Sequence, residues 1–400
     1  MESQGRYKRI LAIKLADLGD LLTITPALQA LRAAHPQARL DLLAMPHSAR
    51  ILEGVPYLDN IIEFDKLPWD DMRELLSPRR LIPAAYSLLA LRRARYDAFA
   101  IFHHPTTRLG SWERAIIAFA VNAPATSGLE SQLPHARIFT RQLTHTFPDT
   151  GFGVMHEADY WLAVAAGLGA DPHSGWRMQI ALNDSHRQAA AHLLEQERIE
   201  DGKGPLVAIH AGSGGYSPAR RWPLDRFAGV AHRLIEQHDA RIVILGGPDE
   251  VDMASNLVQL IDHAPGTGGV VHNLAGRTTL HETAAVIEQC KLFIGNDSGP
   301  MHMAVAVGTP VVAIFGPSNK EAWGPYTPPG QPNQNTVVAR DLPCQPCLYR
   351  ALVYGLREGC GTRPCLLGLG IESVVAACSS KLGSGNGTTP HPHNNLIPTR

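Results

Sequence analysis

The sequence predicts an α/β protein with parallel sheets, and three observations support this class. Short apolar stretches alternate with amphipathic stretches almost throughout the chain, which is typical of parallel strands connected by helices. A length of 400 residues is sufficient for two domains. A polar, irregular region over residues 171–204 separates two series of alternating elements. We therefore expect an N-terminal domain at residues 1–180, a C-terminal domain at residues 181–382, and a disordered tail at residues 383–400.

The first series contains four apolar runs that predict buried strands. They lie at residues 9–15, 38–44, 60–64 and 97–102. Helices are expected at residues 19–36, 69–96 and 151–170. Pro26 falls inside the first of these helices, and we expect it to kink or restart the helix because its ring removes a backbone donor.

The second series repeats the same alternation. Its predicted strands lie at residues 205–210, 240–246, 270–274, 291–295 and 310–316, and its predicted helices at residues 223–237, 250–261, 280–289 and 300–307. A further helix is expected at residues 185–197, within the inter-domain region. Two Rossmann-like halves facing a central cleft are the natural architecture for such a chain.

Composition excludes several classes of partner. The 36 Lys and Arg residues balance 37 Asp and Glu residues, which gives no broadly basic surface for nucleic acid. The N-terminus enters a predicted strand directly and lacks the features of a signal peptide. No stretch approaches the roughly 20 apolar residues that a transmembrane helix needs. We expect a cytoplasmic protein that binds no nucleic acid.

The stretch IKLADLGDLLTITPAL, residues 13–28, leaves the first predicted strand and opens the next helix. Lys14 follows the strand, and Gly19 and Asp20 begin the helix. Asp20 has two interpretations. It is a first-turn carboxylate favoured by the helix dipole, or it is a catalytic base over the cleft, since ligands bind beyond the carboxyl ends of the strands in such sheets.

The stretch HAGSGGYSPARRWPLDRF, residues 210–227, also follows a predicted strand. Its small residues, among them Ser213 and Gly214, allow the backbone to approach a ligand closely. Arg220 and Arg221 can pair with phosphate oxygens. The alternative is a flexible surface loop with solvated arginines, but two arginines beside four small residues favour a binding loop.

The stretch GNDSGPMHMAVAVGTPVVAIFG, residues 295–316, has the pattern strand, turn, helix, strand. Pro300 suits the first helical position. A helix start beyond a strand end presents free backbone N–H groups to an anion, although an ordinary turn has the same pattern. Glu250 follows a neighbouring strand and is a candidate for ribose hydroxyls. Neither half opens with G-x-G-x-x-G, which disfavours a dinucleotide enzyme.

Together with ILGGPDE and LAGRTTLHETAAVI, these stretches resemble glycosyltransferase family 9 in their order and spacing. This family comprises the ADP-heptose:lipopolysaccharide heptosyltransferases and their relatives, and the resemblance covers roughly residues 8–380. It implies a GT-B fold that binds the acceptor in the N-terminal domain and the nucleotide sugar in the C-terminal one. It also implies inverting, metal-independent transfer from an ADP-sugar such as ADP-heptose to a lipid-linked glycan, without a cofactor.

The resemblance assigns roles to individual residues. Asp20 matches the catalytic base, and Arg220 occupies the position of a phosphate-side lysine. On the donor side, the diphosphate is expected at Ser298, Gly299, Pro300 and Met301 near Asp297 and His302, the adenine at Thr278, the ribose at Glu250, and the loop contacts at Ser213 and Gly214. Lys14, Gly19 and His103 are expected on the acceptor side, where His103 and His104 replace an acidic residue of many relatives.

Two other functions use the same features. A nucleotide-sugar epimerase on this fold needs no acceptor site, and a nucleotide-sugar sensor needs no catalysis. Asp20 argues against the sensor, because an acceptor hydroxyl needs a carboxylate to take its proton.

Two further segments have alternative interpretations. Cys344, Cys347, Cys360 and Cys365 have the spacing of a four-thiolate zinc site, but similar cysteines recur in the resembled family without an implied metal, so free thiols are favoured. Residues 79–96 combine apolar residues with arginines at both ends. They form either a helix packed on the sheet or a peripheral contact with the inner membrane.

Overall fold

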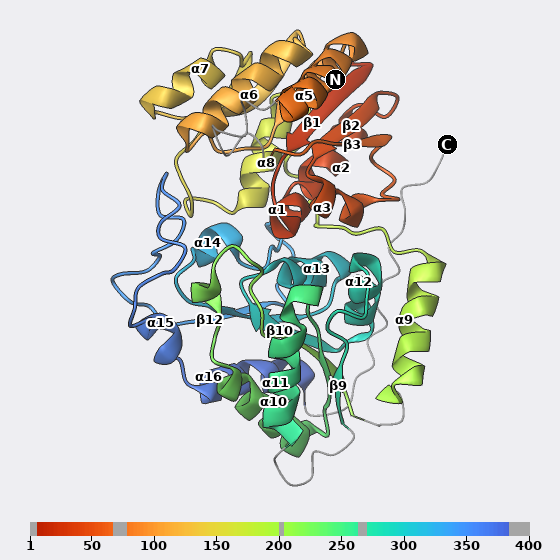
Figure 1. Cartoon of the computed structure of the whole chain (residues 1–400), viewed down its shortest axis with the longest axis vertical. Helices are drawn as coiled ribbons and strands as arrows, with labels where there is room; N and C mark the ends of the chain where they lie inside the picture. The colour runs from red at the N-terminus through yellow and green to blue at the C-terminus, as the bar shows by residue number, and fades with distance from the viewer. Residues whose placement is uncertain (1–5, 67–77, 200–203, 263–269, 384–400) are drawn as a thin grey trace.

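The computed structural model describes residues 6–66, 78–199, 204–262 and 270–383. Two six-stranded parallel sheets form in this part of the chain, one above the other in Figure 1. Their strand orders are β3-β2-β1-β4-β5-β6 and β12-β11-β10-β7-β8-β9. Counted within each half, both orders are 3-2-1-4-5-6, so the chain builds the same doubly wound topology twice. The expected α/β class is confirmed.

The N-terminal sheet contains β1 (Arg9–Lys14), β2 (Arg39–Ala44), β3 (Asn60–Glu63), β4 (Ala98–Ile101), β5 (Ala125–Glu130) and β6 (His145–Pro148). Its helical elements are α1 (Leu18–Thr23), α2 (Thr25–Ala34), α3 (Pro46–Ala49), η1 (Arg50–Leu52), α5 (Pro78–Ala94), α6 (Arg108–Val121), η3 (Pro134–Ala136), α7 (Arg137–Thr140) and α8 (Glu157–Ala166). The first predicted helix is divided at Ile24, two residues before Pro26, which confirms the expected restart.

The C-terminal sheet contains β7 (Leu206–His210), β8 (Arg241–Ile244), β9 (Val271–Asn273), β10 (Leu292–Asn296), β11 (Val311–Phe315) and β12 (Thr336–Ala339). Its helical elements are α9 (Asp184–Gln196), η5 (Pro218–Arg220), α10 (Leu224–His238), η6 (Pro248–Glu250), α11 (Val251–Asp262), α12 (Leu280–Gln289), α13 (Gly299–Val307), α14 (Lys320–Trp323), α15 (Pro364–Leu367) and α16 (Ile371–Leu382).

The structure corrects the helix expected at residues 151–170. Helix α8 begins only at Glu157, and Gly151 and Gly153 lie in a loop with φ values of 92° and 87°. A Cβ on Gly151 would lie 2.7 Å from the carbonyl carbon of Ala351. The loop therefore takes a left-handed conformation at these glycines and touches a segment of the C-terminal half.

Three strands and two long helices were not predicted: β5, β6, β12, α6 and α16. The expectations for residues 69–77 and for residues 384–400 of the tail lie outside the described residues.

A continuous apolar cluster runs through both halves. It includes Phe102 and Trp161 from the N-terminal half and Phe293 and Met301 from the C-terminal half, each with at most 1% of its surface exposed. Because burying large apolar side chains is the main favourable term in folding, this shared core holds the two sheets against each other.

Candidate active site

Lys14 and Asp20 form an ion pair at the carboxyl end of β1. The Nζ atom of Lys14 lies 3.2 Å from Oδ1 of Asp20 and 4.2 Å from the ring centre of Trp161. Lys14 is buried, whereas the Asp20 side chain keeps 32% of its surface exposed. Burial raises the pKa of Asp20 and Lys14 opposes the rise, which leaves the pKa above its ordinary value. The carboxylate is accessible and is a stronger base than an ordinary aspartate.

The starts of α1 and α13 meet where the two halves touch. A Cβ on Gly19 would lie 2.8 Å from Cδ2 of His302, and a Cβ on Gly299 would lie 2.9 Å from Cδ2 of Leu18. Each glycine lets the opposite helix approach. Gly19, predicted on the acceptor side, therefore serves the contact between the halves in this structure.

The start of α13 has the features of an anion site. Its N-cap residue, Ser298, is extended at φ −160°, and its side chain makes no capping hydrogen bond. Gly299 and Pro300 remain partly exposed, whereas the Met301 side chain is fully buried. Met301 therefore faces the site only with its backbone. The first N–H groups of a helix have no partner within the helix, so they are available to an anion.

Ser298 belongs to a buried hydrogen-bonded chain. His210, at the end of β7, has Nδ1 3.1 Å from the Ser298 hydroxyl and Nε2 2.8 Å from Oε2 of Glu250. Burial alone would raise the pKa of Glu250, but bonds from His210 and the Gly247 N–H lower it to about 2. The other carboxylate oxygen, Oε1, is buried without a partner. This free acceptor on a charged group is suited to a ligand hydroxyl.

Arg220 joins the binding loop to the strand end of β10. Its Nη1 donates to Asp297 at 3.2 Å and its Nη2 donates to the Ser213 carbonyl at 2.7 Å, while Nε has no partner. The negative charge of Asp20 raises the pKa of Arg220, after larger effects from burial and Asp297. The carboxylate of one half and the guanidinium of the other are thus within electrostatic range.

The remaining donor-side residues surround this centre. Gly214 has φ +65°, and no atom lies within 4 Å of a Cβ placed on it. The Thr278 hydroxyl makes a hydrogen bond with the Thr283 hydroxyl. Two residues before Thr278, the N–H of Gly276 donates to the carbonyl of Gly246, which lies on the loop that leads to Glu250. Burial lowers the pKa of His302 to about 4, so its ring is neutral at pH 7, and its Nδ1 has no partner.

Asn296 is a site-forming residue that the sequence did not predict. Its amide donates to the carbonyls of Ala211 and Gly212, and its side-chain oxygen accepts from the Trp222 N–H. It therefore fixes both ends of the loop at residues 211–222 against β10. A polar residue that ends an apolar strand was the available signal.

His103 is held inside the N-terminal half. Its Nε2 lies 2.8 Å from the Leu15 N–H group and its Nδ1 lies 3.1 Å from Nη2 of Arg114. Burial, and then the charge of Arg114, keep the pKa of His103 well below its usual value. Because both ring nitrogens have protein partners, any effect of His103 on an acceptor passes through the loop after β1.

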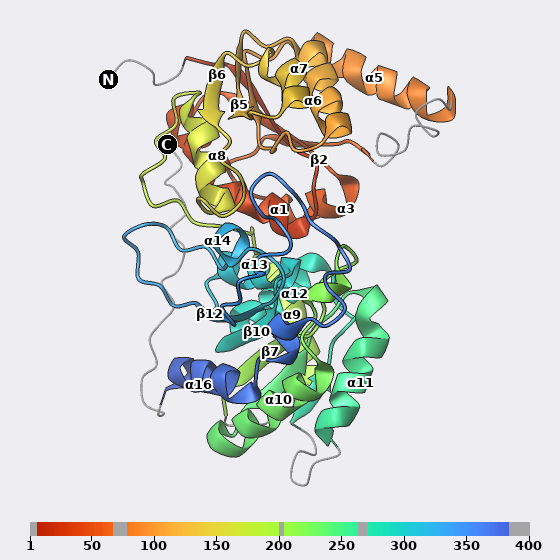
Figure 2. The ribbon, with the colours of Figure 1, turned by 90° about the vertical axis from the view of Figure 1, so that its left-hand side faces the viewer.

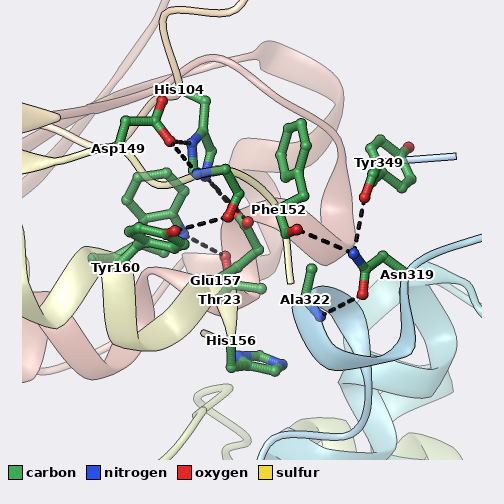
Figure 3. A network of polar contacts seen from close by, with 12 residues as sticks. Thr23, His104, Asp149, Phe152, His156, Glu157, Tyr160, Asn319, Ala322 and Tyr349 are labelled. Carbon is green, nitrogen blue, oxygen red and sulfur yellow. Dashed lines mark hydrogen bonds and ion pairs between the residues drawn. The ribbon is translucent and has the colours of Figure 1, made fainter. Parts of the chain in front are cut away.

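His104 lies between two carboxylates, Asp149 and Glu157 (Figure 3). Nδ1 is 2.9 Å from Asp149 and Nε2 is 3.1 Å from Glu157. The two acids are far from His104 in sequence, so no local pattern indicated this group.

The four clustered cysteines, Cys344, Cys347, Cys360 and Cys365, form no disulfide bonds. Burial, followed by the charges of the other three thiols, raises the pKa of Cys347. Among the described residues, no group of three or more His, Cys, Asp or Glu side chains has the arrangement to hold a metal.

Solved glycosyltransferases share the whole architecture. A glycosyl transferase family 9 protein from Veillonella parvula superposes with a TM-score of 0.71 at 24% identity, covering 95% of this chain and 98% of that one. ADP-heptose lps heptosyltransferase II of E. coli superposes with a TM-score of 0.68 at 19% identity, covering 94% and 98%. The fold is the GT-B fold of glycosyltransferases.

Sequence comparison then identifies the family. The model of glycosyltransferase family 9 (heptosyltransferase) matches residues 90–355. Lipopolysaccharide heptosyltransferase 2 of Salmonella typhimurium is 24% identical over 326 residues, which cover 80% of this chain and 85% of that protein. The chain belongs to glycosyltransferase family 9, as its motifs predicted, and it is an enzyme of the glycosyltransferase class.

Proposed function

We propose that this enzyme transfers a heptose, or a related sugar, from an ADP-sugar to a lipid-linked, lipopolysaccharide-type glycan. The names of its relatives support this substrate pair, since they include a lipopolysaccharide heptosyltransferase and an ADP-heptose heptosyltransferase. In this proposal, residues 1–180 bind the acceptor and residues 181–382 bind the donor. The observation that carries it is Asp20, a partly exposed carboxylate of raised pKa within electrostatic range of Arg220.

Asp20 acts as the general base in the proposed reaction. It takes the proton of the acceptor hydroxyl while that oxygen attacks the anomeric carbon. Attack opposite the leaving diphosphate inverts the configuration at that carbon. Lys14 holds the carboxylate at 3.2 Å, and it stabilises the ionised form that accepts the proton.

The C-terminal half stabilises the departing nucleoside diphosphate. The backbone N–H groups at the start of α13 and the Arg220 guanidinium face the developing negative charge, so no metal ion is required. Asp297 and Ser213 hold Arg220 in place. Oε1 of Glu250 accepts a ribose hydroxyl, and the loop with Thr278 borders the adenine.

The same proposal places the enzyme in the cytoplasm, at the inner membrane where a lipid-linked acceptor is held. No helix in the described part of the chain is long and apolar enough to cross a membrane. A peripheral surface is formed instead by α5 and α6, which pack side by side with a bond from Arg92 to the Phe119 carbonyl. Figure 2 shows α5 projecting from the N-terminal half.

Helices α5 and α6 combine exposed aromatic side chains with positive charge. Tyr86 and Phe119 are each 70% exposed and Trp112 is 54% exposed. Exposed arginines accompany them: Arg92, Arg93 and Arg108. The acidic residues between positions 82 and 122 are Asp97 and Glu113, and neither is exposed. Apolar side chains with arginines and without exposed acids fit an anionic lipid surface.

The test of the catalytic proposal is Asp20→Asn, assayed with ADP-heptose and a lipopolysaccharide-core acceptor. Asparagine keeps the size of the side chain but removes the base. We expect turnover to fall by about 10²-fold or more. If Asp20 is only a first-turn carboxylate, the change costs about 0.3–1 kcal/mol of stability with turnover preserved. Near wild-type transfer by the folded variant would reject Asp20 as the base.

A further inference from the structure

His104 closes the segment that joins β6 to α8. Asp149 follows β6 and Glu157 begins α8, and both bond the same imidazole. The two carboxylates are fully buried and His104 keeps 4% of its side chain exposed. We call these three residues the buried triad. Buried charges persist only when they are paired, so the triad fixes both ends of residues 149–157.

One side of the buried triad leads to Asp20. The His104 ring lies 5.2 Å from the Trp161 ring in an edge-on arrangement. Trp161 in turn carries Lys14 over its ring at 4.2 Å, and its indole N–H donates to the Thr23 hydroxyl at 3.0 Å. Thr23 ends α1, the helix that bears Asp20, so Trp161 contacts both the partner of the base and its helix.

The other side leads to the C-terminal half. Oδ1 of Asp149 accepts from the Gly151 N–H at 3.1 Å, which shapes the loop. The next residue, Phe152, donates its N–H to the Ala351 carbonyl at 2.7 Å and accepts from the Asn319 amide at 3.2 Å. Figure 3 shows Asn319 reaching from the C-terminal half to Phe152, beside the triad.

We propose that the buried triad is a positioning unit that couples the contact between Phe152 and the C-terminal half to the placement of Asp20. This rests on the proposed role of Asp20. His104 is buried with both ring nitrogens bonded to carboxylates, so it acts through Trp161 on one side and the Asp149–Phe152 loop on the other. A shift of about 1 Å in a catalytic group is enough to cost about 10²-fold in rate.

The positive charge of His104 is part of this positioning unit. Burial lowers the pKa of its imidazole, but Glu157 and Asp149 together raise it to about 9. The other titratable groups around it are Tyr160 on α8, His103 in the loop after β4, and Lys14 on β1 beyond Trp161. His104 is therefore a cation at pH 7. Above about pH 9 the imidazole loses its proton, and the two buried carboxylates are left without a counterion.

The test compares His104→Gln with a matched control, His35→Gln. His35 is also a buried histidine of the N-terminal half, but its Nε2 bonds the Leu168 carbonyl, away from the triad. We expect His104→Gln to lower kcat by at least about tenfold, with the donor KM within about twofold. The rate should fall above about pH 9 in the wild type and in His35→Gln, and this fall should be absent in His104→Gln.

Amide hydrogen exchange provides a readout that needs no activity. In His104→Gln, exchange should become faster in α1 and in residues 349–354, but not in His35→Gln. Glu157→Gln is the second variant if His104→Gln does not fold. In this variant the fall of the rate at alkaline pH should begin at lower pH, because His104 loses one of the carboxylates that raise its pKa. Unchanged exchange in both regions, or an equal loss of kcat in the control, would overturn the proposal. A wild-type protein without transferase activity would overturn the proposed function, while the exchange result would still decide the coupling.

Discussion

The two sheets have the same topology but use their carboxyl edges differently. In each half most candidate residues follow the first or the fourth strand, β1 with β4 and β7 with β10, where the strand order reverses. The C-terminal edge offers backbone groups at the start of α13. The N-terminal edge offers a carboxylate, Asp20, supported by buried ion pairs. In the proposed function, one topology thus serves anion binding at one edge and proton transfer at the other.

The largest expected effect is the pH dependence of stability, which comes from His104 in the N-terminal half. His104 has a pKa of about 9 in the folded protein, above the value of about 6.5 of an unfolded histidine. Its contribution to stability is therefore complete below about pH 6.5 and is lost as the pH rises through about 9, a change of about 3 kcal/mol. Melting temperatures between pH 6.5 and pH 9.5 should fall more steeply for the wild type than for His104→Gln. Parallel curves would remove the buried cation from the account.

The second prediction concerns the C-terminal edge. Gly299→Val should weaken ADP binding by about 10²-fold, because the side chain obstructs the start of α13. The new Cβ would also lie 2.9 Å from Leu18, so a disturbed contact between the halves is an alternative cause. The control is Gly299→Val combined with Leu18→Ala, which makes room at that contact. Calorimetric titration that finds ADP affinity restored in the double variant would assign the defect to the contact.

Much of the C-terminal edge was predictable because its chemistry is local. Residues 210–227 and 295–302 carry their glycines, arginines and Pro300 in continuous stretches. The buried triad was not predictable, since it joins positions 104, 149 and 157 through tertiary contacts. Strand β5 was not predicted for a related reason. Its Ser127 is polar, but it is buried because its hydroxyl bonds the Val164 carbonyl.

The third prediction separates the membrane surface from ordinary surface residues. Tyr86→Ser combined with Phe119→Ser should reduce binding to anionic phosphatidylglycerol vesicles by about tenfold. Leu260→Ser on α11 is the control, because Leu260 is also exposed, at 43%, but lies in the C-terminal half. Sedimentation with vesicles measures the effect. Equal binding to neutral phosphatidylcholine, or no loss in the double variant, would contradict an anionic lipid surface.

The smallest expected effect is that of metal removal. If Cys344, Cys347, Cys360 and Cys365 are free thiols, purified protein should contain no stoichiometric zinc or iron. Treatment with a chelator should then leave its melting temperature unchanged. Elemental analysis that finds about one metal per chain, lost in Cys344→Ser, would show that the thiols form a metal site.

The central claim is that the two edges divide catalysis from donor binding. The most direct measurement is the Kd of ADP for Asp20→Asn, taken on the same preparation used for turnover. The account predicts a Kd within about twofold of the wild type, since the base belongs to the other half, together with a loss of about 10² in turnover. A large loss of ADP affinity in that folded variant would contradict the division.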